Sequence, residues 1–258
     1  MRSVDRRQKV VELVMDKGSI SIEDICQRFH ISEMTARRDL TDLDRQGLLR
    51  RVHGGAIASL GRSYEPPFPS RASKNQQMKM AIGLKAATLI HDGDSIALDV
   101  GTTTLEIVPG LIGKRNLTIV TSCLQIANLI VDRLSLEIDA RLILTGGIIR
   151  PRELSMVGAI PERVYLEFHV DKAFIGIGGI SLEEGLTEYN IEDAQIKQML
   201  IRSAREKIVV ADGSKFGVTT FSSVAPLHAV DRIVTDKDAP RELVEKICEA
   251  GVEVILAG

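Results

Sequence analysis

ISEMTARRDLTDLDRQGLLRRVHGGA, residues 31–56, is the stretch that decides the fold of the N-terminal part. Its apolar residues recur at helical spacing: Ala36, Leu40 and Leu43. Ser32 stands just before this helix, where its hydroxyl can accept a hydrogen bond from a backbone N–H of the first turn. Gly47 follows the last apolar residue and predicts the end of the helix. The run LLRRVHGGA then ends in Gly-Gly, which predicts a β-hairpin.

Two further helices are predicted ahead of this stretch. Residues 4–17 alternate valine and leucine with charged residues in an amphipathic pattern, and Gly18 ends it. Ser21 and Asp24 have the spacing of a capping box, so a second helix begins after Ser21. Three short helices and a hairpin bury little apolar surface. They are therefore interpreted as a module that docks onto a partner.

The face of the third helix opposite its apolar residues is centred on Arg38, with Arg37 beside it. Arginine can pair with a guanine edge through two hydrogen bonds, and threonine or methionine can contact the thymine methyl group. Residues 1–56 have a net charge of +2 and the remainder −4, so only the N-terminal part favours a phosphate backbone. The alternative is that both arginines simply face solvent, as exposed charges usually do.

The order of these features resembles the N-terminal domain of the DeoR/GlpR family of bacterial regulators. The string that carries the resemblance is S-x-x-T-x-R-R-D-L, followed by G-x-L-x-R-x-H-G-G-A. The resemblance implies a winged helix-turn-helix that binds double-stranded DNA. It departs at Ala36, where the family usually has a β-branched residue, and this should affect packing more than DNA contacts. The candidate DNA-binding residues are Ser32, Thr35, Arg37, Arg38, Thr41, Arg50, Arg51 and His53.

A change of composition follows the hairpin. Residues 57–73 include Pro66, Pro67 and Pro69, which are expected to exclude a helix and a central strand. We therefore predict three parts: a DNA-binding domain over 1–56, a partly extended linker over 57–73 and an effector-sensing domain over 74–258.

The remaining chain alternates helical and extended patterns. The predicted helices are 74–90, 123–134, 191–204 and 240–251, and the predicted strands are 95–100, 117–122, 140–147, 171–179, 207–216, 230–236 and 252–258. Short β-branched runs separated by helices predict an α/β domain with a largely parallel sheet. Aromatic residues make up only 3% of the chain and Trp is absent, so the core is aliphatic, as suits such a sheet.

Loops rich in glycine, serine and threonine follow five of the predicted strands, at 99–104, 121–122, 145–147, 176–179 and 212–215. In a parallel sheet such loops gather at the carboxyl edge, where open α/β folds bind ligands. Glycine lets backbone N–H groups approach an anion, Lys215 supplies a positive charge, and Asp99 can accept from sugar hydroxyls. Each loop alone is more often a simple turn, but five together favour a phosphorylated, sugar-like ligand. The GIGG run lacks the full dinucleotide pattern, so no NAD or other cofactor is expected.

Residues 74–258 also resemble the sensor domain of the same family, through DVGTTT (99–104), LTGG (144–147), KAFIGIGGI (172–180), IEDAQIK (191–197) and ADGSKFG (211–217). That resemblance implies the fold of ribose-5-phosphate isomerase and a sugar-phosphate effector. The candidate effector-binding residues are Asp99, Gly101, Thr102, Thr103, Thr104, Thr121, Gly146, Gly147, Arg152, Lys197, Asp212 and Lys215. Arg152 could equally be a solvated loop charge. Many relatives read T-N-S where this chain has Thr121-Ser122-Cys123, which alters the donors in that loop.

The leading interpretation is a repressor of sugar or polyol genes that acts as a homo-oligomer, a dimer or tetramer, because one small module contacts too little DNA. A sugar-phosphate isomerase with a regulatory head and a purely architectural DNA protein are the alternatives. We expect no enzymatic turnover. The three cysteines, Cys26, Cys123 and Cys248, lie far apart, so neither a disulfide framework nor a metal site is expected. Without an apolar signal or a membrane-spanning stretch, a cytoplasmic location is predicted.

Overall fold

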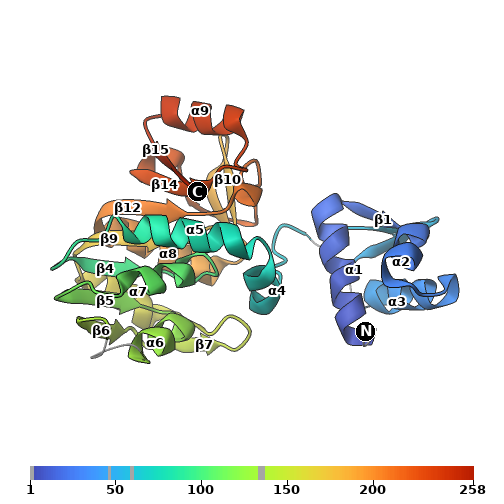
Figure 1. Cartoon of the computed structure of the whole chain (residues 1–258), viewed down its shortest axis with the longest axis horizontal. Coiled ribbons are helices and arrows are strands. Elements are labelled where there is room, and N and C mark those ends of the chain that lie inside the picture. The colour runs from blue at the N-terminus through green and yellow to red at the C-terminus, as the bar shows by residue number, and fades with distance from the viewer. Residues whose placement is uncertain (1–2, 46–47, 59–60, 133–136) are drawn as a thin grey trace. The chain divides into compact units, whose positions relative to one another are not determined.

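The chain folds into two units, residues 1–64 and 65–258 (Figure 1). The structure, a computed structural model, describes residues 3–45, 48–58, 61–132 and 137–258. The division between the units falls inside the stretch predicted as a linker, 57–73. Gly47, the predicted end of the third helix, lies outside the described residues, as do positions 133 and 134 of the predicted helix 123–134.

The N-terminal unit is a winged helix-turn-helix, as predicted. Its elements are α1 (Ser3–Lys17), β1 (Ser19–Ser21), α2 (Ile22–Phe29), α3 (Glu33–Arg45), β2 (Arg50–Val52) and β3 (Gly55–Ile57). The capping box is present, because Asp24 N donates to Ser21 Oγ at 3.0 Å and Ser21 N donates to Asp24 Oδ2 at 3.4 Å. The apolar stripe of α3 packs against α1 and α2 in one buried cluster. The strands form an antiparallel sheet in the order β1-β3-β2.

The proline-containing segment forms a short helix, α4 (Phe68–Ser73), so the expectation that its prolines exclude a helix was wrong. Pro67 stands at the N-cap and Pro69 lies in the first turn. The N–H groups of a first turn have no partner within the helix, so proline costs nothing there and its fixed φ suits the helix. Phe68 is buried, and α4 belongs to the C-terminal unit, which begins at residue 65.

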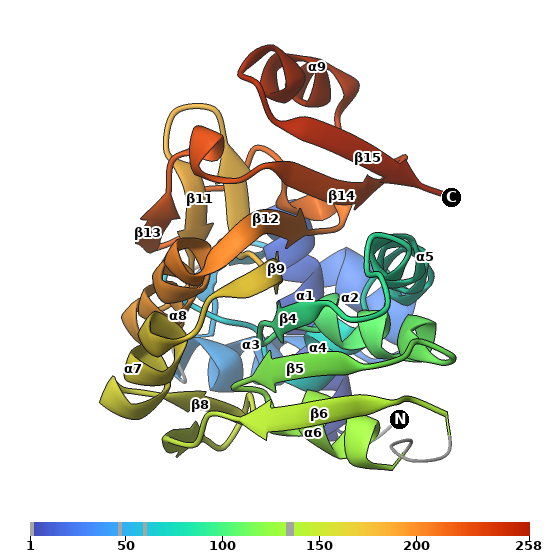
Figure 2. The same cartoon turned by 90° about the vertical axis from the view of Figure 1, so that its left-hand side faces the viewer.

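The C-terminal unit is an α/β domain built on a seven-stranded parallel sheet, in the order β15-β14-β12-β9-β4-β5-β6 (Figure 2). Its strands are β4 (Ser95–Leu98), β5 (Leu117–Thr121), β6 (Ala140–Leu144), β9 (Val170–Ile175), β12 (Ala204–Val210), β14 (Arg232–Asp236) and β15 (Glu253–Ala257). Successive residues of a strand point to opposite faces. In β4, Ile96 and Leu98 join one buried cluster, whereas Ala97 between them joins another. Both faces are therefore buried.

Helices cover both faces of this sheet (Figures 1 and 2). One face carries α5 (Gln76–Ala87), the 3₁₀ helix η1 (Thr104–Leu111) and α6 (Leu124–Val131), and the other carries α7 (Ala159–Glu167) and α8 (Ile191–Ser203). A further helix, α9 (Arg241–Glu249), precedes the last strand. In the part of the chain that the structure describes, no helix is both long and apolar enough to cross a membrane.

Two small antiparallel sheets supplement the parallel one, and the sequence had not indicated them. They are formed by β10 (Gly179–Ser181), β11 (Gly185–Glu188) and β13 (Ser222–Ala225), and by β7 (Ile148–Arg150) and β8 (Ser155–Val157). Each of these strands has only three or four residues. Such short segments show too little of the two-residue alternation to be recognised.

Candidate DNA-binding and ligand sites

The exposed face of α3 carries the residues predicted to contact bases. Ser32 caps the helix, with Thr35 N donating to Ser32 Oγ at 3.3 Å. Arg37 and Arg38 are exposed, and Met34 on the same helix is 81% exposed, although it is a large apolar side chain. Arg37 Nη2 lies 2.6 Å from Glu33 Oε1, but both side chains are more than half exposed, so a phosphate can displace this weak pair.

Two of the residues predicted to bind DNA, Thr41 and Arg51, connect α3 to the wing, which is the hairpin of β2 and β3. Arg51 Nη1 donates to Thr41 Oγ1 at 2.7 Å, and the Arg51 backbone N–H donates to Asp44 Oδ1 at 3.2 Å. Thr41 Oγ1 in turn donates to the Arg37 carbonyl at 2.7 Å. Arg50 on β2 and His53 in the hairpin turn are exposed. The structure therefore brings all eight candidates onto α3 and its wing, with Thr41 and Arg51 also holding the two together.

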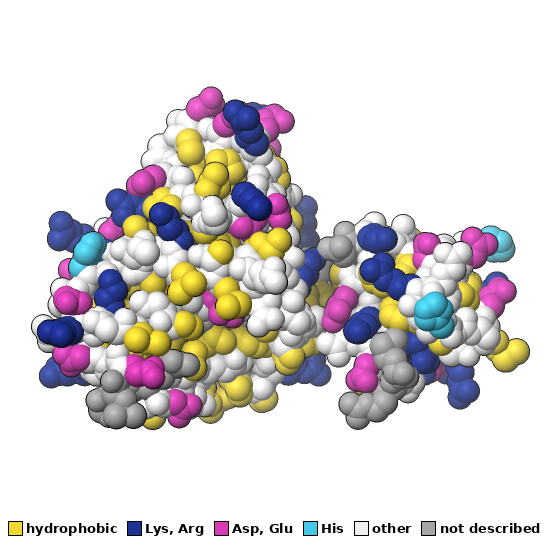
Figure 3. Space-filling model, viewed as in Figure 1, with side chains coloured by type: hydrophobic (Ala, Val, Ile, Leu, Met, Phe, Trp, Pro, Cys, Tyr) yellow, Lys and Arg dark blue, Asp and Glu magenta, His cyan; other side chains and the backbone are white. Residues whose placement is uncertain are grey.

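Basic side chains on this unit are interspersed with acidic ones on the face that Figure 3 shows. This agrees with the small positive charge of residues 1–56. Bulk charge alone would therefore attract DNA weakly, and specific contacts from α3 must supply most of the selectivity.

Asp39 was not among the sequence candidates, yet it fastens α3 to α1. Its buried carboxylate accepts from Arg6 Nε at 2.7 Å and from Arg7 Nε at 2.8 Å. Burial alone would raise the pKa of Asp39, but these two hydrogen bonds outweigh it and hold the pKa below its usual range. The only indication in the sequence that Asp39 is buried was its position directly before the apolar residue Leu40.

Asp39→Ala is expected to lower the free energy of unfolding of the N-terminal unit by about 1–3 kcal/mol, because it removes two charge-assisted hydrogen bonds from a buried site. Asp42→Ala is the matched control, since Asp42 pairs with Arg7 Nη2 at 2.6 Å but is 30% exposed. Urea unfolding of both variants, followed by circular dichroism, measures the difference. Equal losses for the two variants would show that Asp39 does not anchor the helix.

The five strand-end loops do meet at one edge of the parallel sheet. The strands that precede them, β12, β9, β4, β5 and β6, are consecutive neighbours in the sheet. Gly176 N after β9 donates to Asp99 Oδ2 after β4 at 3.1 Å. A Cβ atom added at Gly101 would lie 2.9 Å from Thr104 Oγ1 of its own loop, and one added at Gly176 would lie 3.2 Å from the Val100 carbonyl oxygen, so glycine lets both loops pack closely.

Asp99 and Lys197 form a buried ion pair at this edge. Lys197 Nζ on α8 lies 2.5 Å from Asp99 Oδ2 and 3.3 Å from Glu188 Oε2. Burial raises the pKa of Asp99 to about 6, although Lys197 opposes the shift. Burial would lower the pKa of Lys197, but Asp99 and Glu188 outweigh it and raise that pKa. Asp99 and Lys197 are therefore both charged at neutral pH. Glu188 was not among the candidate residues predicted from the sequence.

The loop after β12 holds the other candidate charges. Asp212 Oδ1 accepts from Asn75 Nδ2 at 3.0 Å and from Ser214 N at 3.1 Å, which caps the 3₁₀ helix η2 (Gly213–Lys215). Burial would raise the pKa of Asp212, but its hydrogen bonds with Ser214 and Asn75 hold that pKa below its usual range. Lys215 is half-buried, with Nζ 3.3 Å from Tyr189 Oη and 5.4 Å from the ring centroid.

The predicted threonines divide into two groups. Thr104 Oγ1 donates to the Gly101 carbonyl at 2.9 Å, and Thr121 Oγ1 donates to the Leu98 carbonyl at 2.7 Å. These hydroxyls hold the backbone of their loops. Thr102 and Thr103 lie in the same loop and each keeps 7% of its surface exposed. They are therefore the better placed threonines for contact with a ligand.

Gly146 and Gly147 adopt positive φ angles of 73° and 127°. A Cβ atom at Gly147 would also lie 2.8 Å from Pro161 Cδ, so that position requires glycine for packing as well. Nearby, Ser122 Oγ is buried and has no hydrogen-bond partner within the described part of the chain. Ser155 Oγ and Tyr165 Oη are also buried and have no hydrogen-bond partner among the described residues.

Arg152 stays a prediction. It is exposed, and within the described ranges no hydrogen bond or ion pair connects it with another candidate. Two residues earlier, Arg150 points inward instead and donates to Glu65 Oε2 at 2.7 Å and to Asp193. Arg150 is the last residue of β7, whereas Arg152 lies in the turn that follows, and the sequence did not separate them.

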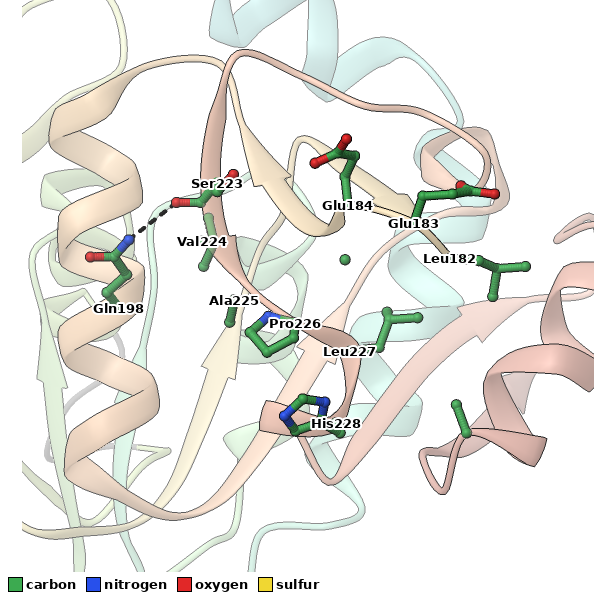
Figure 4. A pocket seen from close by; sticks show the side chains of 12 residues that line it. Leu182, Glu183, Glu184, Gln198, Ser223, Val224, Ala225, Pro226, Leu227 and His228 are labelled. Carbon is green, nitrogen blue, oxygen red and sulfur yellow. Dashed lines mark hydrogen bonds between the residues drawn. The ribbon is translucent and has the colours of Figure 1, made fainter.

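A groove lies beside the small antiparallel sheet of β10, β11 and β13 (Figure 4). Figure 4 shows Glu183 and Glu184 on one side and the run from Ser223 to His228 on the other, with Gln198 Nε2 donating to the Ser223 carbonyl at 3.1 Å. None of the twelve residues that line this groove is among the effector candidates. The groove and the predicted ligand site at the carboxyl edge of the sheet are therefore formed by different residues.

Solved structures resemble parts of the chain only distantly. Ribose 5-phosphate isomerase A from Methanocaldococcus jannaschii matches with a TM-score of 0.39 and 19% identity, covering 55% of each chain. A probable sor operon regulator from Shigella flexneri matches with a TM-score of 0.44 and 14% identity, covering 66% of this chain and 89% of that one. Because both TM-scores lie below 0.5, neither match bears on what this chain binds.

Sequence comparisons cover nearly the whole chain. The model of the DeoR-like helix-turn-helix domain matches residues 6–59, and that of the DeoR C terminal sensor domain matches residues 74–237. The glycerol-3-phosphate regulon repressor of Escherichia coli K12 is 31% identical, covering 99% of this chain and 100% of its own. The transcriptional repressor AccR of Agrobacterium fabrum is 35% identical, covering 95% and 93%. The chain therefore belongs to the DeoR family of DNA-binding transcriptional regulators.

Proposed function

We propose that this protein is a repressor of sugar or polyol genes that is controlled by a phosphorylated, sugar-like ligand. The convergence of five glycine- and threonine-rich loops on one sheet edge supports this most strongly, because that edge also holds the half-buried Lys215. Backbone N–H groups and an ammonium together suit a phosphate. The relatives include a glycerol-3-phosphate regulon repressor and a putative aga operon repressor, which is consistent with control of carbon-source genes.

DNA binding is assigned to α3 and its wing, and ligand binding to the loops of the C-terminal unit. We propose that the protein acts as a homo-oligomer, since a single module of this size contacts too few base pairs for specific recognition. A ligand that prefers one arrangement of the chain shifts the equilibrium toward it and so changes operator affinity.

The proposal includes no enzymatic turnover. An isomerase needs a general base that faces the substrate. Asp99 is the carboxylate best placed by burial, but it is paired with Lys197 at 2.5 Å. A proton-exchange assay with pentose and hexose phosphates tests this part, and measurable exchange would revive the enzymatic alternative.

Lys215→Ala is expected to leave operator binding by the ligand-free protein unchanged and to weaken ligand binding about 10- to 150-fold, because one charge-assisted hydrogen bond contributes about 1.5–3 kcal/mol. A thermal-shift screen of sugar and polyol phosphates identifies the ligand first, since a ligand that binds the folded state raises its apparent stability. Binding of the protein to promoter DNA of its own gene is then measured with and without that ligand.

Lys85→Ala is the control, since Lys85 is an exposed lysine on α5, outside the five strand-end loops. It should respond to the ligand as the unchanged protein does. Loss of operator binding in the ligand-free Lys215→Ala protein would contradict the division of labour between the two units.

A further inference from the structure

Lys79 is a buried lysine on α5 that contacts the end of α4. Its side chain is 4% exposed, and Nζ donates to the Lys74 carbonyl at 2.7 Å and to the Arg71 carbonyl. The last carbonyls of a helix have no partner within it, and a lysine can satisfy them. An ammonium from α5 therefore caps the C-terminal end of α4.

The same lysine lies within the electrostatic reach of the candidate ligand loop. Burial lowers the pKa of Lys79 to about 8, with smaller contributions from Lys215, Arg71 and Lys74, while Asp212 opposes the shift. A hydrogen bond also joins the two regions, because Asn75 Nδ2, just before α5, donates to Asp212 Oδ1 at 3.0 Å. Lys79 is thus linked to the loop 212–215 through Asn75 and through its electrostatic interactions with Asp212 and Lys215.

The other side of α4 is held by a cluster of charged groups. Arg71 donates to Glu65 Oε1 at 3.0 Å and to Glu153, and Arg150 donates to Glu65 Oε2 at 2.7 Å and to Asp193. Three carboxylates thus share two guanidinium groups. Burial and the neighbouring carboxylates raise the pKa of Glu153 to about 7, against the effect of Arg71. Ion pairs therefore hold the side chain of Arg71, and Lys79 holds the carbonyl groups at the end of α4.

We infer that Lys79 is the residue through which an anion bound beside the loop 212–215 acts on α4: its ammonium leaves the two carbonyls of α4 and binds the anion. An ammonium binds a phosphate oxygen more strongly than a neutral carbonyl, so the exchange is favourable. Releasing these carbonyls loosens the last turn of α4, the helix that follows the DNA-binding unit in the chain. The inference rests on the proposed function for the position of the ligand.

Hydrogen exchange with mass spectrometry on the full chain tests this exchange of partners. Saturating inorganic phosphate is compared with chloride at equal ionic strength. In the unchanged protein, phosphate should protect residues 211–217 and speed exchange in residues 68–74 several-fold. Exchange in 68–74 reports the hydrogen bonds that hold this helix, such as Arg71 N to the Pro67 carbonyl and Lys74 N to the Ser70 carbonyl.

Three variants separate the role of Lys79 from general packing. Lys79→Met should exchange fast in residues 68–74 with or without phosphate, while phosphate still protects residues 211–217. Lys79→Arg keeps the charge and should retain the response. Lys85→Met replaces an exposed lysine of the same helix and should behave as the unchanged protein does.

The outcomes distinguish the inference from the function on which it rests. If phosphate protects residues 211–217 of the unchanged protein but leaves exchange in 68–74 as in chloride, the inference is wrong and the proposed ligand site stands. If phosphate protects neither segment, the ligand site is wrong and the inference fails with it.

Discussion

Arg38→Ala is expected to weaken operator binding by about 5- to 150-fold, corresponding to about 1–3 kcal/mol for one bidentate contact with a base. Arg38 is exposed on α3, opposite the side on which Ala36 and Leu40 are fully buried. Its guanidinium is therefore free to enter a major groove while the apolar side stays packed. Fluorescence anisotropy on operator DNA and on unrelated DNA, at the same salt concentration, measures the specific part of the loss.

Two further variants make the Arg38 experiment decisive. Lys9→Ala removes an exposed positive charge from α1 and should change binding to both DNAs little and equally. Arg37→Ala should lower binding to both DNAs and reduce the salt dependence, if Arg37 exchanges Glu33 for a phosphate. An Arg38→Ala protein that loses operator and unrelated DNA affinity equally would show that Arg38 contacts the backbone and not a base.

The sequence was sufficient to predict the elements whose signals are local. The capping residues Ser21 and Ser32, the apolar stripe of α3 and the wing hairpin all follow from residues within a few positions of one another. The parallel sheet was equally predictable, because short β-branched runs that alternate with helices leave few other arrangements. That the loops after five strands meet at one edge is a consequence of parallel pairing alone.

Partners that are distant in the sequence could not be predicted. Asp39 binds Arg6 and Arg7 across about thirty positions, and Lys197 binds Asp99 across 98 positions. Nothing near these residues in the chain indicates which charges will be buried together. The helix α4 was missed for another reason, since prolines exclude a helix interior but not a first turn.

In the candidate ligand site too, the sequence indicated residues of the loops but not the partners that they bind. Gly101 and Asp212 were recognised from loop composition, but the structure adds the constraint that Asp99 is already engaged with Lys197. Asp99→Ala would thus leave a buried ammonium without its nearest partner, so a loss of ligand response in that variant would not show that Asp99 contacts the ligand. Lys215, which is half-buried and has no carboxylate partner among its described contacts, is the cleaner position to test.

Lys197→Met is expected to lower the free energy of unfolding of the C-terminal unit by about 3–5 kcal/mol at neutral pH, because it leaves the buried carboxylates of Asp99 and Glu188 without their cation. Lys207→Met is the matched control. Lys207 Nζ lies 3.1 Å from Asp231 Oδ2, but the Asp231 side chain is 46% exposed, so that pair contributes about 0–1 kcal/mol. Urea unfolding followed by circular dichroism compares the two variants.

The pH dependence of the decrease in unfolding free energy caused by Lys197→Met identifies the cause of that decrease. The pKa of Asp99 is already raised to about 6 in the folded protein, so between its unfolded value and 6 the folded state binds more protons. The contribution of such a group to the free energy of unfolding falls as pH rises. Without Lys197 the pKa of Asp99 rises further, so the loss caused by Lys197→Met should be smaller at pH 5 than at pH 7.5. A loss of equal size at both pH values would mean that Lys197 acts through packing and not through its charge.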